Sequence, residues 1–514
     1  MTNKNNIRIA KNTLMLYIRQ VVTLLVSLYT VRIVLKALGV EDYGIYNVVG
    51  GFVGIMGILS ASMSTATQRF LAFEIGKENQ RKLNQVFSMS VNIHFIVMLL
   101  ILLLAETLGL WFLNSQLTIP SERMEAALWV YQFSILASLI GVISVPYNAI
   151  IIAHERMSVF AWISIAEVGL KLLLVIILQW ASIDKLKLYS ILMFAVSLII
   201  RIIYGTYCNR NFSENKFQWF WDQKLFKKMM GFAGWNLFGN GATIIVTHGV
   251  NLLSNIFFGP AINAARGIAT QVSNAIWTFA INFQTALNPQ IIKTYSTGEY
   301  KVMQSLMVKS SKFSYYLLLL ISLPVLFEME QLLNLWLTEV PPYAVLFAQL
   351  MLIRYLIDTM SNSLIVGAQA AGNIRIFQSA TGALTLLNIL ITYIFFKTGY
   401  PPETTIIVSI SISFLLLITR LLILKTMINF SIILFINKVI YKVLAVTILS
   451  IPLPFYINQT TTESLFRFLL STTTIINCVL LSVFAIGLEK EERILIVNYI
   501  RTIIRRIRIS FAER

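Results

Sequence analysis

Charged residues, cysteine and histidine are all scarce in this sequence of 514 residues. Aspartate, glutamate, lysine and arginine together account for 12% of it, and there are two cysteines and three histidines. Cys208 and Cys478 lie far apart, in neither a C-x-x-C nor a zinc-finger spacing. We therefore expect two buried thiols, and neither a disulfide framework nor a metal site.

Sequence motifs for covalent chemistry are also absent. No G-x-x-x-x-G-K-[ST] occurs, which excludes ATP hydrolysis through a P-loop. His94, His154 and His248 lie in different segments, no H-E-x-x-H occurs, and no paired carboxylates suggest acid–base catalysis. The longest connector expected on the outer side runs only from about Gln331 to Pro342, which leaves no room for an external catalytic domain. We predict a protein that is not an enzyme and that holds no cofactor.

Apolar residues dominate the chain. They make up 57% of it, and the mean hydropathy is +0.75, values typical of a protein whose solvent is lipid. Because about 20 apolar residues in a helix cross a bilayer core, the pattern predicts an all-α polytopic membrane protein with about fourteen transmembrane helices. The expected spans are 13–37, 44–67, 86–113, 124–152, 158–180, 188–208, 229–258, 262–288, 313–330, 343–370, 376–396, 404–424, 440–457 and 464–487.

Basic residues concentrate in alternate connectors. With the N-terminus inside, the inner connectors hold 30 of the 41 lysines and arginines, and the outer connectors hold 4. This asymmetry follows the positive-inside rule and predicts that both termini are cytoplasmic. The first apolar stretch is too long for a signal-peptide core and lacks a cleavage site, so we expect it to remain as the first span. Topology and contact with anionic lipid account for the net charge of +18, and we expect no nucleic-acid partner.

Two groups of six spans resemble each other. Leu38-Gly39 ends one span and Thr65-Ala66 closes the next, as Phe258-Gly259 and Thr285-Ala286 do in the second group. Six spans with the same starting side imply a parallel repeat, with a substrate site between two lobes. The predicted organisation is a first lobe at 1–210, an interfacial linker at 211–228, a second lobe at 229–428, two accessory helices at 429–488 and a basic cytoplasmic tail at 489–514.

The linker and the tail both combine apolar residues with basic ones. Trp219 and Trp221 lie near Lys224 in the linker, and Ile500 and Arg501 lie in the tail. Such interleaving can stack nucleobases, but beside membrane spans it is typical of a helix in the headgroup region. We expect an interfacial helix in the linker and a tail that rests on the inner leaflet.

Seven basic and three acidic residues fall inside or at the edges of the expected spans. A lysine or arginine at the bilayer centre costs about 2.5–3.5 kcal/mol on insertion scales, so each one requires a partner, water or a function. We predict a water-filled cationic cavity that holds the phosphates of an anionic substrate. Its candidate residues are Arg19, Arg32, Lys36, Lys171, Arg266 and Arg354.

Structural roles for some of these charges stay open. Arg32, Lys36 and Arg467 lie near the ends of spans and can extend to the interface. Two pairs are spaced by four residues, which lets opposite charges neutralise each other on one helix face. They are Glu167 with Lys171 and Arg354 with Asp358. The candidates for coupling to a proton or sodium gradient are Glu167, Asp358 and His248.

Three sequence stretches carry a family resemblance. They are Asn12-Thr13-Leu14, Leu38-Gly39-Val40-Glu41-Asp42-Tyr43-Gly44-Ile45-Tyr46-Asn47 and Gln68-Arg69-Phe70. With these stretches and its repeated six-span lobes, the chain resembles bacterial polysaccharide-biosynthesis flippases of the Wzx type. That family belongs to the multidrug/oligosaccharidyl-lipid/polysaccharide (MOP) exporter superfamily, and the resemblance covers nearly the whole chain.

The resemblance implies a transporter of the bacterial inner membrane with two lobes. It would flip an undecaprenyl-diphosphate-linked oligosaccharide to the periplasmic leaflet by alternating access, for O-antigen or another surface polysaccharide. It also implies cationic residues in the central cavity, at positions that Arg19 and Arg266 can fill. The expected partners are the lipid-linked glycan and the bilayer, the expected state is a monomer, and association with a polysaccharide polymerase stays open. Two alternatives remain: a cation-coupled multidrug or small-molecule antiporter of the same superfamily, and a membrane enzyme that acts on lipid-linked sugars.

Overall fold

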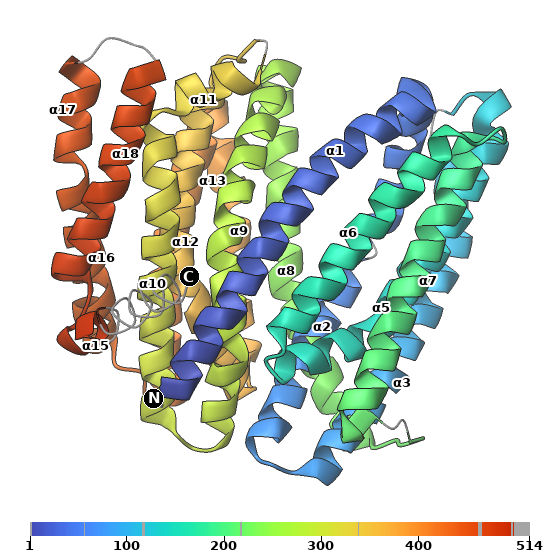
Figure 1. Ribbon diagram of the computed structural model, residues 1–514, viewed down its shortest axis with the longest axis horizontal. Coiled ribbons are helices and arrows are strands. Elements are labelled where there is room, and N and C mark those ends of the chain that lie inside the picture. Colours follow the sequence, from blue (N-terminus) through green and yellow to red (C-terminus); the bar gives the residue numbers. More distant parts are fainter. Residues whose placement is uncertain are drawn as a thin grey trace, which may run out of the picture. The chain divides into compact units, whose positions relative to one another are not determined.

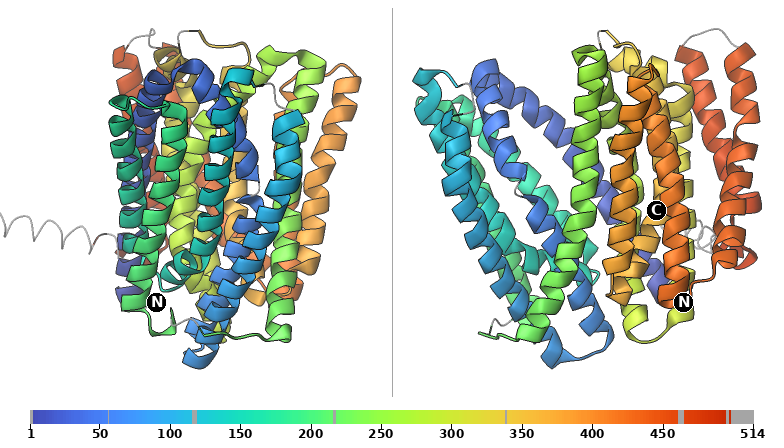
Figure 2. Two further views of the ribbon diagram at one scale, coloured as in Figure 1. Left: turned by 90° about the vertical axis from the view of Figure 1, so that its right-hand side faces the viewer. Right: turned by 180° about the vertical axis from the view of Figure 1, so that it is seen from behind.

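The computed structural model describes residues 3–55, 57–115, 119–215, 218–337, 339–460, 465–494 and 497. Every regular element in these ranges is helical, as predicted (Figures 1 and 2). Helix suits a chain in lipid because it satisfies the backbone polar groups within one segment. The α-helices are α1 (Asn3–Ile55), α2 (Gly57–Gly76), α3 (Gln80–Leu104), α4 (Leu110–Ser115), α5 (Met124–Ala153), α6 (Met157–Gln179), α7 (Lys185–Asn211), α8 (Gln223–Phe258), α9 (Pro260–Ser296), α10 (Tyr300–Phe327), α11 (Met329–Trp336), α12 (Ala344–Ala371), α13 (Arg375–Lys397), α14 (Thr404–Ile428), α15 (Ile432–Phe435), α16 (Tyr441–Ser450), α17 (Pro452–Thr460) and α18 (Leu465–Ser482). Most of the predicted basic tail lies outside the described residues.

Twelve helical segments among the described residues are long and apolar enough to cross a membrane. They correspond to twelve of the expected spans. The other two, expected at 44–67 and 262–288, are helical as well: the first covers the end of α1 and most of α2, and the second lies in α9. Neither combines the required length with the required apolar content. The chain is therefore a multi-pass helical membrane protein, and the count of fourteen spans is not confirmed.

The sequence repeat is visible in the backbone. Gly39 interrupts α1 with a φ of +81°, and Gly259, between α8 and α9, has the same φ. After the next helix, Glu78 and Gly298 also have positive φ values, 54° and 79°. Both pairs are separated by the same number of positions in the sequence. Since positive φ is uncommon outside turns and caps, this coincidence supports the predicted repeat.

The linker does not form a separate interfacial helix in its described residues. It contains one 3₁₀ turn, Ser213–Asn215, and residues 218–222 are not helical before α8 begins at Gln223. The linker lies along α3 instead, because a stripe of polar side chains on that helix binds it. These side chains are Gln80, Asn84, Ser88 and Asn92, which hydrogen-bond to linker residues Ser213, Glu214, Gln218 and Phe220.

Glu214 anchors this linker. Its carboxylate contacts Nε2 of His154 at 2.5 Å and accepts a hydrogen bond from Gln80, while the His154 ring stacks on Phe212 at 4.5 Å. Burial alone would raise the pKa of Glu214. The hydrogen bonds from His154 and Gln80 outweigh burial and hold that pKa at about 2.

The chain forms two compact units, and the first comprises residues 1–247, 282–306 and 364–386. Within it, α5 packs against α7, α2 and α3, and α1 packs against α6 (Figure 2). Leu16, Ile152, Met157 and Ala286 form one of its apolar clusters, which joins α1, the α5–α6 turn and α9. The lobe boundaries predicted from the sequence stay a prediction.

The second unit comprises residues 248–281, 307–363 and 387–514. In it, two buried ion pairs join α10 and the residue that follows it to α18 and to the segment that comes after α18. Lys312 Nζ lies 2.7 Å from Glu492 Oε2, and Arg467 Nη2 lies 3.5 Å from Glu328 Oε2. The sequence allowed Arg467 to extend to the membrane interface. It does not do so in the structure, because it is buried against a carboxylate.

Candidate functional site

A polar cavity of about 450 Å³ lies between α1 and α6 in the first unit. Side chains recur every three or four residues on α1, so they share one face of that helix. The facing residues of α6 follow the same spacing. The cavity is lined by Arg19, Gln20, Thr23, Ser27 and Thr30 of α1 and by Ser164, Glu167, Val168 and Lys171 of α6.

Arg19 is a cation of this cavity without a carboxylate partner among the described residues. Its Nη2 donates a hydrogen bond of 2.9 Å to Asn282 Oδ1, and its guanidinium lies 4.8 Å from the centre of the Phe160 ring. Its Nε is buried and has no hydrogen-bond partner in the described part of the chain. An arginine whose partners are neutral retains its charge, and its other N–H groups can bind an anion.

Lys171 and Glu167 form an ion pair on α6. Lys171 Nζ donates to Glu167 Oε1 over 2.6 Å, and both side chains remain partly exposed to the cavity. The pair neutralises itself, as the spacing of four residues predicts. The net charge of the cavity therefore comes from Arg19.

Arg266 forms part of a second polar cluster, in the second unit. Its Nε donates to Asn251 Oδ1 over 3.0 Å, and its Nη1 donates to Thr405 Oγ1 over 2.8 Å. These partners come from α8 and α14, and both are neutral. Like Arg19, Arg266 keeps its positive charge without an ion pair among the described residues.

Arg354 and Asp358 pair on α12 in the same unit. Arg354 Nε lies 3.3 Å from Asp358 Oδ2. Arg420, on α14, donates a hydrogen bond to Ser361, one turn further along α12. Its side chain is half-buried within α14.

Three of the predicted site residues do not join these clusters. Arg32 and Lys36 are exposed on α1, and His248 is exposed on α8. None of the three borders the polar cavity or the apolar groove described next. The structure thus groups Arg19, Glu167 and Lys171 in one unit, and Arg266, Arg354 and Asp358 in the other.

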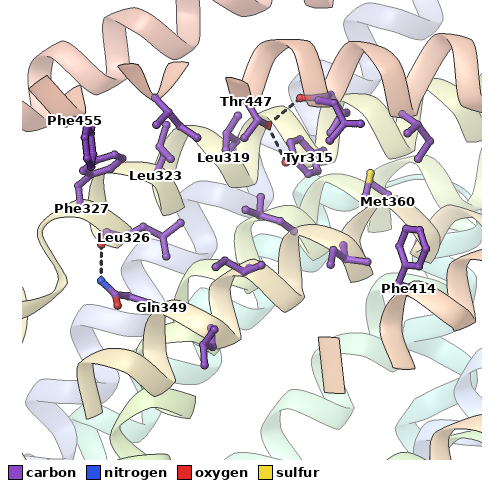
Figure 3. Close-up of a pocket in the computed structure, with 18 of the residues that line it drawn as sticks. Tyr315, Leu319, Leu323, Leu326, Phe327, Gln349, Met360, Phe414, Thr447 and Phe455 are labelled. Carbon is purple, nitrogen blue, oxygen red and sulfur yellow. Dashed lines mark hydrogen bonds between the residues drawn. The ribbon is translucent and has the colours of Figure 1, made fainter. Parts of the chain in front are cut away.

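An apolar groove of about 920 Å³ lies in the second unit between the accessory helices and α10, α12 and α14 (Figure 3). Leucines, isoleucines and phenylalanines form most of its wall. Of its polar side chains, Tyr315 and Thr447 pair through hydroxyls that lie 2.9 Å apart, and Gln349 donates to the carbonyl oxygen of Leu326 (Figure 3). The groove therefore suits a hydrocarbon chain and offers little to a charged group.

The hydroxyl-bearing wall of the polar cavity was not predicted. Gln20, Thr23, Ser27 and Thr30 recur at helical spacing in an otherwise apolar span, so periodicity alone contained this signal. Asn282 carried no comparable signal. It meets Arg19 only through the tertiary packing of α1 and α9.

The residues of the polar cavity, the Arg266 cluster and the apolar groove can bind ligands without covalent chemistry. Hydroxyl and amide groups can bind sugar hydroxyls, arginine can bind phosphate, and the apolar groove can hold lipid. Among the described residues, no group of three or more histidine, cysteine, aspartate or glutamate side chains could hold a metal ion.

Comparison with known proteins locates the fold. No family model and no curated protein matches the sequence. Among solved structures, an outward-facing multidrug resistance MATE family transporter of the MOP superfamily shares 13% identity, covers 84% of this chain and 98% of its own, and has a TM-score of 0.70. MATE in the straight conformation shares 14% identity over 82% of this chain and 96% of its own, with a TM-score of 0.70.

A third structure is a MOP superfamily transporter from Pyrococcus furiosus, for which reverse polarity of the binding pocket suggests a different function. It shares 12% identity over 84% of this chain and 98% of its own, with a TM-score of 0.68. Likeness at such low identity concerns the fold. The chain shares the fold of these MOP superfamily transporters.

Proposed function

We propose that this protein flips an undecaprenyl-diphosphate-linked oligosaccharide across the bacterial inner membrane during synthesis of a surface polysaccharide. Transport would proceed by alternating access and would require no covalent step. The proposal combines the Wzx-type sequence resemblance with the MOP superfamily fold and the two binding surfaces of the chain.

The observation that carries the proposal is the composition of the polar cavity. One arginine without a carboxylate partner shares it with four hydroxyl-bearing side chains and a glutamine, while its only acid is paired with Lys171. A cavity with this balance suits a phosphate next to sugar hydroxyls. A lipophilic cation would require an unpaired acid instead.

The apolar groove supports a lipid-linked cargo. It is walled almost entirely by hydrocarbon, and the accessory helices form one side of it. Burial of each CH₂ group of an isoprenoid chain contributes roughly 0.8 kcal/mol. Within the proposal, the groove binds part of the lipid while the glycan and diphosphate occupy polar surroundings.

The proposed membrane topology has fourteen spans with both termini in the cytoplasm. The stretches 44–67 and 262–288 would count as spans because each lies in long helical structure at equivalent places of the repeat, and a span lining a wet cavity needs less apolar surface. The 30 inner and 4 outer basic residues support this orientation. The proposal retains the predicted lobes, a monomeric state, and a proton or sodium gradient as the driving force, with association with a polymerase left open.

A cation-coupled antiporter is the second candidate, because two of the compared structures are MATE transporters. The Pyrococcus furiosus transporter, for which reverse pocket polarity suggests a different function, indicates that this fold serves more than one cargo. Charge separates the two candidates here. The acids Glu167 and Asp358, named as coupling candidates, both pair with a basic residue.

A reconstituted transport assay tests the proposal. Purified protein in vesicles receives a fluorescent undecaprenyl-diphosphate oligosaccharide, and a membrane-impermeant glycosidase measures its appearance in the opposite leaflet. Arg19→Gln should reduce the flipping rate by about tenfold or more, as expected when a charge-assisted bond to phosphate is lost.

Arg32→Gln is the matched control, because Arg32 lies on the same helix and does not border the cavity. It should leave the flipping rate unchanged. Uptake of a lipophilic cation by the same vesicles, without glycan flipping, would instead establish the antiporter.

A further inference from the structure

The second helices of the two repeats meet at equivalent positions in the first unit. Gly39 and Gly259 occupy equivalent positions in the two repeats. At the same separation in the sequence, Gly76, the last residue of α2, is equivalent to Ser296, the last residue of α9. A Cβ atom placed on Gly76 would lie 2.0 Å from Ser296 Oγ and 3.0 Å from both Cα and O of Lys293. Glycine therefore suits this approach of α2 to α9, because a side chain would press against Ser296 and the backbone of Lys293.

Glu155 forms one ionic cluster next to this contact. It occupies the turn between α5 and α6 with a φ of +60°, and it is 3% exposed. Its carboxylate accepts hydrogen bonds from Lys293 Nζ at 2.7 Å and Gln290 Nε2 at 3.1 Å, and it pairs with Arg8 Nη2 at 2.9 Å. Lys293 and Gln290 belong to α9, in the second repeat, while Glu155 belongs to the first.

The same turn is also held from its own repeat. Asn12 of α1 donates a hydrogen bond of 2.9 Å to the carbonyl oxygen of Glu155. The α5–α6 turn is thus bound by the first helix of its own repeat and by the second helix of the other repeat.

Arg69 forms the corresponding cluster in the opposite sense. It lies on α2 in the first repeat and is 4% exposed. Its Nε and Nη2 donate hydrogen bonds of 3.0 and 2.9 Å to the carbonyl oxygens of Gln369 and Ala370, at the end of α12 in the second repeat. Gly372 follows with a φ of +87°, and a Cβ there would lie 2.6 Å from Arg69 Nη2.

An asparagine on the first helix of this repeat contributes here as well, as Asn12 does to the Glu155 cluster. Asn236 of α8 accepts hydrogen bonds from Gln378 at 2.9 Å and Gln369 at 3.5 Å. This turn, too, is clasped by the first helix of its own repeat and the second helix of the other. The two clusters therefore share one architecture but use different chemistry, a buried carboxylate in one and a buried guanidinium in the other.

We propose that the Glu155 cluster, the Arg69 cluster and the Gly76–Lys293 contact between them form a two-latch gate that closes this end of the first unit. Each latch joins one repeat to the other, so the repeats can separate here only when both latches break together. When one latch breaks while the other stays closed, its charged group loses its partners in a buried position, which makes this intermediate unfavourable. The gate thus has two discrete states, open and closed.

The gate does not depend on the cargo. It rests on contacts within the protein, so any substrate of the transporter would meet it. Its test therefore uses no substrate, and failure of the glycan assay would leave its outcome unaffected.

Distance measurement between spin labels tests the gate in the full chain. Cys208 and Cys478 are replaced by serine, and labels are attached to Lys82→Cys and Glu299→Cys, which are exposed in different repeats beyond α2 and α9. In lipid nanodiscs, Glu155→Gln and Arg69→Lys should each shift the equilibrium toward longer distances by roughly tenfold, as expected for loss of a charge-assisted bond. The double variant should shift it further than either single variant.

Gly76→Ala provides an independent variant that changes no charge. It should also lengthen the distance, because the added methyl group presses against Ser296 and the Lys293 backbone. If Glu155→Gln or Arg69→Lys fails to fold, this variant decides the question.

Two matched controls are available in the chain. Glu78→Gln removes a carboxylate from an exposed turn that also has positive φ, and Gly44→Ala adds a methyl group where no atom lies within 4 Å. Both should leave the distance distribution unchanged. Unchanged distances in Glu155→Gln, Arg69→Lys and Gly76→Ala would overturn the gate, as would equal lengthening in the controls.

Discussion

Arg19 and Asn282 are 263 positions apart in the sequence, yet Arg19 Nη2 donates a hydrogen bond of 2.9 Å to Asn282 Oδ1. Asn282 holds the guanidinium without neutralising it, since an amide oxygen carries no net charge. The arrangement positions a cation beside the polar cavity and leaves its charge available. In the proposed flippase, this charge would meet the diphosphate.

Asn282→Asp tests whether that charge matters. The new carboxylate would form an ion pair with Arg19 and cancel the net charge of the cavity, so flipping of an anionic glycan lipid should fall by about tenfold or more. The vesicle assay measures it. Asn274→Asp, on the same helix about 12 Å along its axis, adds the same charge elsewhere and should have a smaller effect; equal losses in both variants would contradict the role of Arg19.

Lys312 offers a test of how the segment after α18 is held against α10. Its side chain is 1% exposed and pairs with Glu492, so Lys312→Met would leave a buried carboxylate unpaired. We expect the free energy of unfolding to fall by about 3–5 kcal/mol, measured by denaturant or thermal unfolding in detergent. Lys301→Met removes an exposed lysine from the same helix and should change little.

The double variant Lys312→Met/Glu492→Leu separates charge from packing. Replacing both members of a buried pair by apolar residues often costs little, so most of the lost stability should return. If the double variant is as unstable as the single one, the unpaired carboxylate is not the cause.

Local patterns in the sequence predicted the helices and the self-neutralising pairs. Apolar runs predict helical spans, and a spacing of four residues predicts that Lys171 meets Glu167, because both signals are contained in one segment. The stretches 44–67 and 262–288 do not give this apolar signal. Buried polar residues such as Ser62 and Asn282, which hydrogen-bond to other helices, lower their hydropathy, and hydropathy does not record which neighbours cover them.

Contacts between distant segments could not be predicted from the sequence. In the sequence Glu155 lies in a short stretch between two expected spans, and its burial depends on Lys293, which belongs to the other repeat. The linker was predicted to be an interfacial helix because its aromatic and basic residues fit that pattern. The competing signal, a stripe of polar residues along α3 that binds the linker backbone, was present in the sequence but has meaning only once the two segments are side by side.

Acidic pH should loosen this linker. The pKa of Glu214 is held at about 2, below its ordinary value of 4.5, so its ionised form stabilises the folded state. That contribution is fully present above about pH 5 and is lost as the pH falls from about 4.5 toward 2. Limited proteolysis of the 211–228 segment at graded pH measures the change.

Glu214→Gln supplies the control for this pH dependence. It should raise cleavage at neutral pH and make cleavage less dependent on pH below 5, because the titrating carboxylate is gone. A wild-type protein with no added sensitivity between pH 5 and 3 would contradict the assignment.

The apolar groove gives the last prediction, because α16 presents two leucines that differ in where they lie. Leu444 lines the groove, whereas Leu449 is similarly exposed and does not line it. Leu444→Trp would fill part of the groove, so flipping of a long isoprenoid-linked glycan should slow by several-fold at unchanged thermal stability. Leu449→Trp should have no effect on either. A substrate with a shortened lipid should be less affected by Leu444→Trp than the full-length one, since it occupies less of the groove. Equal slowing of both substrates would show that the groove does not bind the lipid.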